Sequence, residues 1–474
     1  MNFAPILPEV IITLGAIALM MVAAFVRRAS AITHWGAVAL LIAAAVSLVG
    51  APQEAGAVFG GMWAADGFAA FGKVIIYLSA AVAIIMAHGW FDRGFEHGAE
   101  YPVLILLSAL GASVMVSSTD LMMLYVGLEL QSLSAYVLAS YRRHDERSAE
   151  AGLKYFVLGG LASGILLYGI SLLYGFAGTT YFSGISAAFA DDGASLGLTF
   201  GLVFTLAGLA FKISAVPFHM WTPDVYEGAP TPVAAFFAAG QKAAAILLAT
   251  RVCIDAMGPA TDSWRQIVIF AALASIILGA VAAFGQTNIK RLLAYSSINN
   301  VGFAMVGIAA GGEAGAAAVL VYLAVYVVMT LGAFLIVMRM RDAEGRPVES
   351  IDSLAGLSVT RPALAWAMMA FMLSLAGIPP LFGFWPKLMV FNVAVQAGLL
   401  PLAIAAAVLT VVGAYYYLKI VKVMFFDVPA EPFAAARGRV ETVLIAACAL
   451  AISPLGYLII NPLSTLAANA ASVF

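Results

Sequence analysis

The sequence places charged side chains inside long apolar segments. We assign five lysines and no arginine to the interior of such segments: Lys73, Lys154, Lys212, Lys242 and Lys387. One carboxylate, Glu129, lies deep in an apolar segment. A charge in hydrocarbon costs a few kcal/mol or more unless it faces a partner or a wet cavity. This pattern predicts a path for protons or other ions.

The choice of lysine indicates which chemistry is expected. Arginine keeps its proton in proteins, whereas a desolvated lysine can be tuned to release its proton near neutral pH. The alternative is a set of internal salt bridges that only hold helices in register. We favour proton transfer, because buried groups of this kind are chemically able to switch.

The elements that position these residues are membrane-spanning helices. Of the 474 residues, 63% are hydrophobic and 10% are charged, whereas soluble proteins have roughly 25% charged residues. This composition excludes a soluble enzyme, and a net charge of −2 does not suggest a nucleic-acid partner. Apolar runs of membrane length occur at about 7–26, 32–51, 67–89, 102–118, 119–140, 151–176, 197–219, 230–252, 266–285, 290–311, 314–339, 363–398, 401–426 and 441–460. We predict an all-α polytopic membrane protein with about 14 spans, forming one domain over residues 1–474.

The basic residues predict how the spans are oriented. Connections after odd-numbered spans hold sixteen of the 23 Lys and Arg, whereas connections after even-numbered spans hold only Arg251 and Arg265. The positive-inside rule then places the odd connections in the cytoplasm and both termini outside. The Ala-rich composition suggests a bacterium, and therefore its cytoplasmic (inner) membrane with periplasmic termini. In this orientation Lys154 lies near the cytoplasmic end of its span, and Lys73, near an outer end, is expected to snorkel to the interface.

Prolines interrupt two spans beside buried lysines. Pro217 follows Lys212 in span seven, and the segment GIPPLFGFWPK at 377–387 interrupts span twelve up to Lys387. Unwound backbone at membrane depth is tolerated where it is buried in protein or lines a cavity, and half-helix ends bring partial charges there. A proline kink that only shapes packing is the alternative.

The two broken spans are five apart, which predicts an internal repeat. Spans 4–8, over residues 102–252, and spans 9–13, over residues 266–426, would be copies of a five-helix unit. An odd number of crossings makes the second copy inverted, as in many secondary transporters. Asp224 and Glu227 follow span seven on the cytoplasmic side, where we favour a solvated turn over a proton entry.

No metal or redox centre is expected on this chain. Cys253 and Cys448 both belong to apolar segments, and the histidines lack metal-ligand spacing. The sequence also contains no nucleotide-binding G-x-x-x-x-G-K-[ST] motif.

Several motifs together resemble a known family. They are FKISAVPFH at 211–219, MWTPDVYEGAPTPVAAFF at 220–237, MMLYVGLELQSLSAYVLASY at 122–141, IKRLLAYSSINNVGF at 289–303 and GIPPLFGFWPK at 377–387. The chain resembles the antiporter-like membrane subunits of respiratory complex I, the NADH:quinone oxidoreductase, over essentially its whole length. Three features are similar to the N-type branch of this family: the segment WTPDVYEGAPTP, the lysine at 387 and the absence of a long lateral helix after the last span.

The resemblance implies a set of proton-translocating residues: Glu129, Lys212, Lys242, Lys387, Lys154 and His219. Glu129 would pair with Lys212, Lys242 would be the central relay, and Lys387 would connect to the outer side.

Two further roles and two departures follow from the same resemblance. Lys154 resembles a lysine that modulates the pair, and His219 resembles a histidine that bridges the two half-channels through water. Pro386 directly before Lys387 and Gln241 directly before Lys242 depart from the family pattern, which affects the expected local helix geometry.

The resemblance also implies cofactors and partners. The chain itself would carry no cofactor, while NADH, FMN, iron–sulfur clusters and quinone would be handled by other subunits. Expected partners are the adjacent M-type subunit, the small K-type subunit and the lateral helix of the L-type subunit, together with lipids and protons and no nucleic acid. The alternatives are a subunit of a multisubunit cation (Na⁺)/proton antiporter, or a membrane scaffold whose ion pairs are purely structural.

Overall fold

The structure is a computed structural model that describes residues 4–26, 29–50, 58–91, 98–191, 195–434 and 438–474. Within these residues the regular elements are helices, and the β pairs are isolated bridges. The all-α prediction is confirmed. It follows from the composition, because a helix satisfies every backbone hydrogen bond within its own segment in hydrocarbon.

The helices follow one another along the chain in four groups. The first is η1 (Ala4–Ile6), α1 (Leu7–Phe25), α2 (Ala29–Ser47), η2 (Phe59–Gly61) and α3 (Gly67–Phe91). The second is α4 (Tyr101–Ser117), α5 (Leu121–Ala139), α6 (Glu146–Ala177), α7 (Phe182–Asp191), α8 (Leu196–Ile213), α9 (Trp221–Gly228), α10 (Thr231–Phe236), the π-helical η3 (Phe237–Gln241), α11 (Lys242–Arg251) and the π-helical η4 (Val252–Ala256). The third is η5 (Gly258–Ala260), α12 (Thr261–Phe284), α13 (Ile289–Ala310), α14 (Gly312–Val337), η6 (Asp352–Leu354), α15 (Leu357–Thr360), α16 (Pro362–Ala376), α17 (Phe384–Gln396) and α18 (Leu400–Phe426). The last is α19 (Arg439–Ile452), η7 (Pro454–Ile459) and α20 (Ile460–Ala471).

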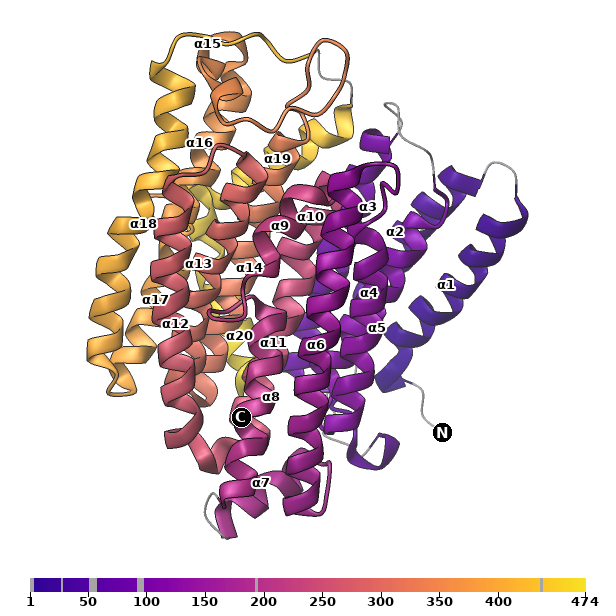
Figure 1. Cartoon of the computed structure of the whole chain (residues 1–474), viewed down its shortest axis with the longest axis vertical. Coiled ribbons are helices and arrows are strands. Elements are labelled where there is room, and N and C mark those ends of the chain that lie inside the picture. The colour runs from indigo at the N-terminus through magenta and orange to yellow at the C-terminus, as the bar shows by residue number, and fades with distance from the viewer. Residues whose placement is uncertain (1–3, 27–28, 51–57, 92–97, 192–194, 435–437) are drawn as a thin grey trace.

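The helices form one bundle with a buried centre. Figure 1 shows α1 and α2 on one flank and α17 and α18 on the other, with α11, α13 and α14 between them. The segment Thr231–Ala256 is entirely buried and α13 and α14 are nearly so, whereas little more than a quarter of the apolar stretch of α1 and of α18 is buried. An exposed apolar helix faces lipid, and a helix apolar on all sides can occupy the core. Lys242 lies in the segment that is buried throughout.

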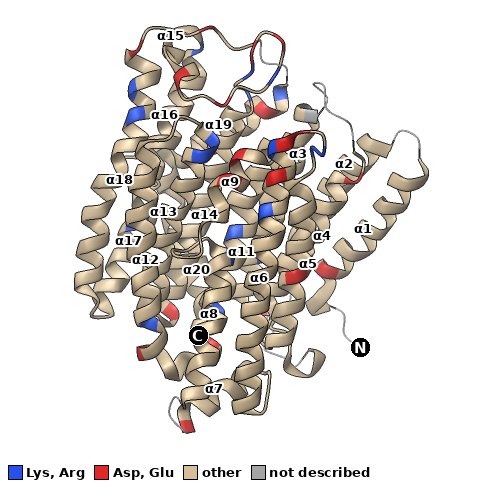
Figure 2. Ribbon diagram, in the orientation of Figure 1, with Lys and Arg blue, Asp and Glu red and all other residues tan. Residues whose placement is uncertain are grey.

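Eleven described helices are long and apolar enough to cross a membrane, or twelve if the bent pair α19–α20 counts as one span. Two shorter apolar helices, α4 and α16, accompany them. The count of about 14 spans stays a prediction. Figure 2 shows more of the charged residues at the end of the bundle that carries α15 than at the opposite end, and the α15 end is the one formed by odd-numbered connections.

The first predicted helix break lies between α8 and α9. Helix α8 ends at Ile213, and Ser214 takes a left-handed conformation with φ 65°. Two hydrogen bonds hold the break: the indole N–H of Trp221 donates to the carbonyl of Phe211 at 2.9 Å, and the amide of Val216 donates to Ser275 Oγ at 2.9 Å. These bonds replace part of what the helix loses at Pro217.

The second break lies between α16 and α17. Helix α16 ends at Ala376 and is capped by Gly377, whose φ is 80°, and the amide of Gly383 donates to Ser374 Oγ at 3.0 Å. The prediction that Pro386 contributes to this break is wrong. Pro386 lies in the first turn of α17, where a residue without an N–H leaves no helix hydrogen bond unmade.

The structure corrects the expected end of the last span and adds one short helix. The last span was expected to end at 460, but α19 and the helix after it are bent by 64° at Ser453, and α20 continues to Ala471. After the bend, helix α20 packs on α3 and α14. The connection after α6 contains a short helix, α7, whose Phe182, Ile185 and Phe189 are buried.

Candidate functional site

Glu129 and Lys212 lie on neighbouring elements without a direct ion pair. Glu129 on α5 accepts a hydrogen bond from Ser163 of α6. Lys212, near the end of α8, donates to Ser132 Oγ of α5 at 2.6 Å and to the Tyr136 hydroxyl at 3.4 Å. Ser132 follows Glu129 by less than one turn of α5. The structure therefore brings the predicted pair to the same stretch of α5, with serine hydroxyls as the immediate partners of both.

A row of aromatic rings leads from Lys212 toward the centre of the bundle. Tyr136 meets Tyr155 edge-on at 4.9 Å, and Tyr155 stacks on Trp221 at 4.4 Å. Trp221 is followed by Tyr226 at 6.4 Å. The ammonium of Lys212 lies 5.6 Å from the ring of Tyr136 at one end of this row, and that of Lys242 lies 5.3 Å from the ring of Tyr226 at the other.

Lys242 is the first residue of α11 after the π-helical η3. Its side chain is 2% exposed, and its Nζ donates to Ser297 Oγ of α13 at 2.8 Å. Ser297 also shares a hydrogen bond of 2.8 Å with the hydroxyl of Tyr326 on α14. Among the described residues Lys242 forms no salt bridge, so neutral hydroxyls and an aromatic ring hold it. Gln241, the residue that departs from the family pattern, belongs to the π-helical turn that orients Lys242.

A second set of hydroxyls and an amide continues from α13 into α14 and α18. Tyr322 donates to Asn300 Oδ1 at 2.8 Å, and Asn300 Nδ2 donates to the Tyr417 hydroxyl at 3.2 Å. Tyr417 also shares a hydrogen bond with Ser296 at 2.5 Å. These residues were not predicted from the sequence, although the segment SSINN at 296–300 contains an unusually large number of polar side chains for an apolar helix. Hydroxyls both donate and accept, which suits them to pass protons.

Lys387, in the first turn of α17, points back across the second break. Its Nζ donates to the carbonyls of Leu375 at 2.9 Å and Ala376 at 3.1 Å, the last residues of α16. These carbonyls have no partner within the helix and carry its negative dipole end. The ammonium also lies 4.5 Å from the ring of Phe303. Phe303 and Ser297 are six residues apart on α13, about 9 Å along its axis, so α13 contacts both Lys387 and Lys242.

Replacing Gly377 by alanine is expected to disturb Lys387 directly. The left-handed backbone would cost about 1 kcal/mol for any residue with a Cβ, and that Cβ would stand 2.8 Å from Lys387 Cδ. The matched control is Gly398→Ala, where φ is 78° and no atom lies within 4 Å. We expect a similar loss of thermal stability in both variants, with proton translocation reduced only in Gly377→Ala. Equal translocation in the two would show that Lys387 tolerates the crowding.

His219 lies in the first break, half buried, and its Nδ1 has no hydrogen-bond partner among the described residues. An unsatisfied buried nitrogen at a helix break is a position where water or a proton can be accepted. His219 follows Lys212 by seven residues, and the structure places it within the break that the sequence predicted.

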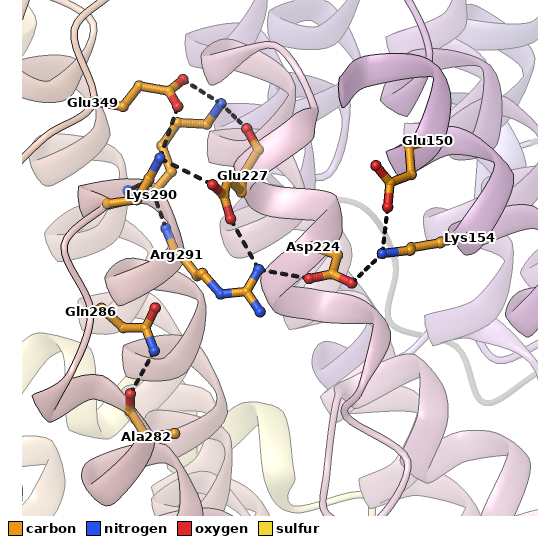
Figure 3. A network of polar contacts seen from close by, with 10 residues as sticks. Glu150, Lys154, Asp224, Glu227, Ala282, Gln286, Lys290, Arg291 and Glu349 are labelled. Atoms are coloured by element: carbon orange, nitrogen blue, oxygen red, sulfur yellow. Dashed lines mark hydrogen bonds and ion pairs between the residues drawn. The ribbon is translucent and has the colours of Figure 1, made fainter. Parts of the chain in front are cut away.

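The end of the bundle that was expected to face the cytoplasm carries an ion-pair network, shown in Figure 3. Asp224 on α9 binds Lys154 of α6 at 2.7 Å and Arg291 of α13 at 2.6 Å. Glu227 binds Arg291 at 3.0 Å. The predicted solvated turn is wrong, because these carboxylates lie on a helix and tie it to two others. Lys154 is itself 42% exposed, so it belongs to this end of the molecule and not to the buried interior.

Lys290 extends the same network to the loop before η6. It binds Glu349 at 2.9 Å and donates to the carbonyls of Glu227 and Ala229. Burial by itself would raise the pKa of Glu349, but the adjacent Lys290 ammonium outweighs it and holds that pKa below its ordinary value. This contact fastens the loop to the start of α13.

The pairing of Asp224 predicts a pH-dependent stability. Burial would raise the pKa of Asp224, but hydrogen bonds from Lys154 and Arg291 hold it below its ordinary value, which is about 4 in an unfolded chain. The stabilisation is therefore present above about pH 4 and is lost as pH falls through the lower folded value. Asp224→Asn should lower stability by about 1 kcal/mol at pH 7, with the difference from wild type shrinking below about pH 4.

Thermal unfolding of the purified protein across this pH range measures that difference. Asp427→Asn is the control, because Asp427 pairs with Lys422, which is 63% exposed, and such a pair contributes little. A destabilisation by Asp224→Asn that is the same at low and neutral pH would contradict the prediction.

Lys73 does not snorkel to the interface, contrary to expectation. Its side chain is 2% exposed and its Nζ lies 2.8 Å from Glu9 of α1. Glu129 was predicted to be the one carboxylate deep in an apolar segment, but Glu9 is also buried, at 7% exposure. Glu9 lies only two residues into α1, so its position in the sequence resembled that of an exposed span end.

The described residues contain no group of three or more His, Cys, Asp or Glu that could hold a metal ion. The site is instead built from lysines, one carboxylate, hydroxyls and aromatic rings. Such a set can transfer protons.

Comparison with known proteins identifies the family. Residues 118–413 match the family described as NADH:quinone oxidoreductase/Mrp antiporter, TM. A protein of Rhizorhabdus wittichii named NADH-quinone oxidoreductase subunit N is 62% identical, with 100% of this chain and 99% of that protein covered. The chain belongs to the subunit N family. A subunit N of Sphingopyxis alaskensis is 57% identical over 100% of this chain and 99% of its own length.

Solved structures agree with membership in the subunit N family. A chain of respiratory complex I from Thermus thermophilus has a TM-score of 0.84 and 31% identity, covering 97% of this chain and 99% of that chain. A chain of the Mrp complex from Dietzia has the same TM-score at 21% identity, with 100% and 97% coverage, and this second likeness concerns the fold alone. The resemblance stated from the motifs is confirmed, and the chain is a multi-span membrane subunit of a respiratory complex.

Proposed function

We propose that this chain is the proton-translocating N-type subunit of NADH:quinone oxidoreductase. Protons move through Glu129, Lys212, Lys242 and Lys387, while NADH oxidation and quinone reduction take place on other subunits. One observation carries this proposal: Lys212, Lys242 and Lys387 are buried, and among the described residues their partners within hydrogen-bond distance are hydroxyls and carbonyls. A structural ion pair would place a carboxylate there.

Glu129 and Lys212 act as the switch in this proposal. A nearby carboxylate stabilises an ammonium, and weakening that influence favours proton release. Each tenfold change in a proton-binding equilibrium corresponds to about 1.4 kcal/mol, so a modest movement of Glu129 relative to Lys212 suffices to send a proton toward Lys242. The energy for that movement comes from the redox subunits, because this chain is proposed to bind no redox cofactor.

The remaining predicted residues act at the ends of this route. Lys387 connects Lys242 to the outer side, supported by their shared contact with α13. His219 bridges the two half-channels at the first break. Lys154 modulates the Glu129–Lys212 pair from the cytoplasmic end, where its contacts with Glu150 and Asp224 set its position.

The proposed architecture is a pair of inverted repeats, residues 102–252 and 266–426. In support, each half contains a helix that ends in a left-handed residue beside the break, Ser214 in the first and Gly377 in the second. We place both termini on the periplasmic side of a bacterial inner membrane, in agreement with the charged end of Figure 2.

The proposed partners are the M-type and K-type subunits and the lateral helix of the L-type subunit. NADH, FMN, iron–sulfur clusters and quinone are assigned to the rest of the complex. The names of the full-length relatives favour this assignment over a cation/proton antiporter.

Affinity purification of the tagged chain from its native membrane in mild detergent tests the assignment. Flavin, iron–sulfur clusters and NADH:quinone activity in the purified sample are the expected result. Recovery with small membrane subunits only, and no NADH oxidation, would overturn it in favour of the multisubunit cation/proton antiporter.

A further inference from the structure

Glu9 and Lys73 form a second buried acid–base pair that the proposed route does not use. Glu9 lies in the first turn of α1 and Lys73 in the second turn of α3, both near ends assigned to the outer side. Their charged atoms are 2.8 Å apart, and the ammonium of Lys73 lies 4.6 Å from the ring of Trp63.

Hydroxyls extend this pair inward along α3 and α4. Ser113 of α4 donates to Glu9, and Tyr77 of α3 shares a hydrogen bond of 2.7 Å with Ser113. The second carboxylate oxygen of Glu9, Oε2, is buried and has no hydrogen-bond partner among the described residues. A carboxylate that only fastened helices together would be stabilised by satisfying both oxygens, so the free oxygen indicates a proton or water acceptor.

Lys73 borders a small cavity near the same end of the bundle. The cavity has a volume of about 20 Å³, enough for one water molecule. Its lining includes Asp66 and Lys73 together with Ala4, Pro5 and Pro8 from the start of the described chain. Lys73 therefore contacts this cavity on one side and Glu9 on the other.

Helix α4 contacts both the pair and the residue before Lys242. Gln241, the residue before Lys242, donates to Ser108 Oγ of α4 at 2.9 Å. Ser113, which contacts Glu9, follows Ser108 by five residues, about 7.5 Å of helix rise. Helix α4 thus carries one hydroxyl bonded to Gln241 and another bonded to Glu9.

A neighbouring ion pair contains an arginine in place of a lysine and so cannot release a proton. Arg251 Nη2 donates to both oxygens of Asp66 at 2.8 Å, and the guanidinium lies 5.1 Å from the ring of Phe68 and 5.6 Å from that of Phe474. This buried arginine is suited to holding structure, since it does not give up its proton. Lys73, in contrast, is a residue type that is able to release one.

We propose that Glu9 and Lys73 form an outward proton-release port, a branch of the route that reaches the outer surface through α1, α3 and α4. The port rests on the proposed function of the subunit. Lys73 releases its proton to water on the outer side, and Glu9, protonated from the Ser113 side, returns a proton to the neutral amine. Each cycle moves one proton outward and restores both groups.

Lys73→Arg in the assembled complex tests the port. Arginine keeps the charge and the pairing with Glu9 but does not release a proton, so a purely structural pair would leave activity unchanged. We expect proton translocation in proteoliposomes to fall about tenfold, less than the roughly hundredfold for removing a positioned proton carrier because the port is a branch of the route, and coupled NADH:quinone turnover to fall with it. Lys290→Arg is the matched control, because Lys290 is equally buried and pairs with Glu349; it should translocate protons as wild type does.

Wild-type translocation by assembled Lys73→Arg would overturn the port. If that variant does not assemble, the double variant Glu9→Gln with Lys73→Met removes both charges together, and wild-type translocation by it would equally overturn the port. Acidifying only the outer side should slow wild type more than the assembled variant, a response that a structural pair would not alter. The Lys242→Met variant separates the two proposals: if it translocates normally the proposed function fails, whereas if it alone is inactive only the port fails.

Discussion

Lys242→Met is expected to lower proton translocation by the assembled complex about a hundredfold, because it removes the central proton carrier. Lys242 is held by Ser297 and the ring of Tyr226, and no described carboxylate forms a salt bridge with it. Methionine fills a similar volume without the buried charge, and Ser297 keeps its bond to Tyr326. Exchanging an unpaired buried charge for an apolar side chain is neutral or stabilising, so the complex should assemble.

This combination separates catalysis from a structural role. If Lys242 only held helices in register, Lys242→Met would reduce assembly and leave the assembled complex active. The measurement is therefore proton translocation per mole of assembled complex in proteoliposomes, with the amount of assembled complex determined in parallel. Lys419→Met is the control, since Lys419 donates to the carbonyl of Phe284 at the edge of the bundle and should leave translocation unchanged. Normal translocation by assembled Lys242→Met would refute the relay.

Lys212→Arg is expected to keep the complex assembled and to reduce proton translocation about tenfold or more. Arginine retains the positive charge opposite Glu129 and still donates hydrogen bonds to Ser132 and Tyr136, the partners of Lys212. It does not release its proton, so the switch would stay in one state. Lys212→Arg removes proton release and keeps the positive charge, whereas a lysine-to-alanine change removes both together.

Turnover and translocation of the purified complex, measured together, check this prediction. Lys290→Arg again serves as the control, because it makes the same change within the Lys290–Glu349 pair. Should Lys212→Arg disrupt local packing, Lys212→Met gives a second test, since it also lacks a releasable proton and should be equally inactive. Wild-type proton transfer by assembled Lys212→Arg would remove Lys212 from the switching role.

The helical class, the helix breaks and the proposed proton-transfer residues could be predicted from the local chemistry of the sequence. Hydropathy predicted the helical class, since twenty or so apolar residues suffice to cross a bilayer. The helix breaks at Pro217 and within 377–383 followed from proline's missing N–H and fixed φ. The choice of lysine at Lys212, Lys242 and Lys387 pointed to proton transfer, because arginine keeps its proton, and the specific motifs identified the family.

Only the tertiary structure decided which groups meet. Lys73 was expected at the interface, yet it pairs with Glu9, and Asp224 joins Lys154 to Arg291 where a free turn was expected. The aromatic row from Tyr136 to Tyr226 and the contact of α13 with both Lys242 and Lys387 were likewise invisible in the sequence. The physical reason is that a helix apolar on all sides has no periodicity to show which face turns inward. The sequence therefore determined which residues can carry protons, and helix packing determined the partners to which they pass them.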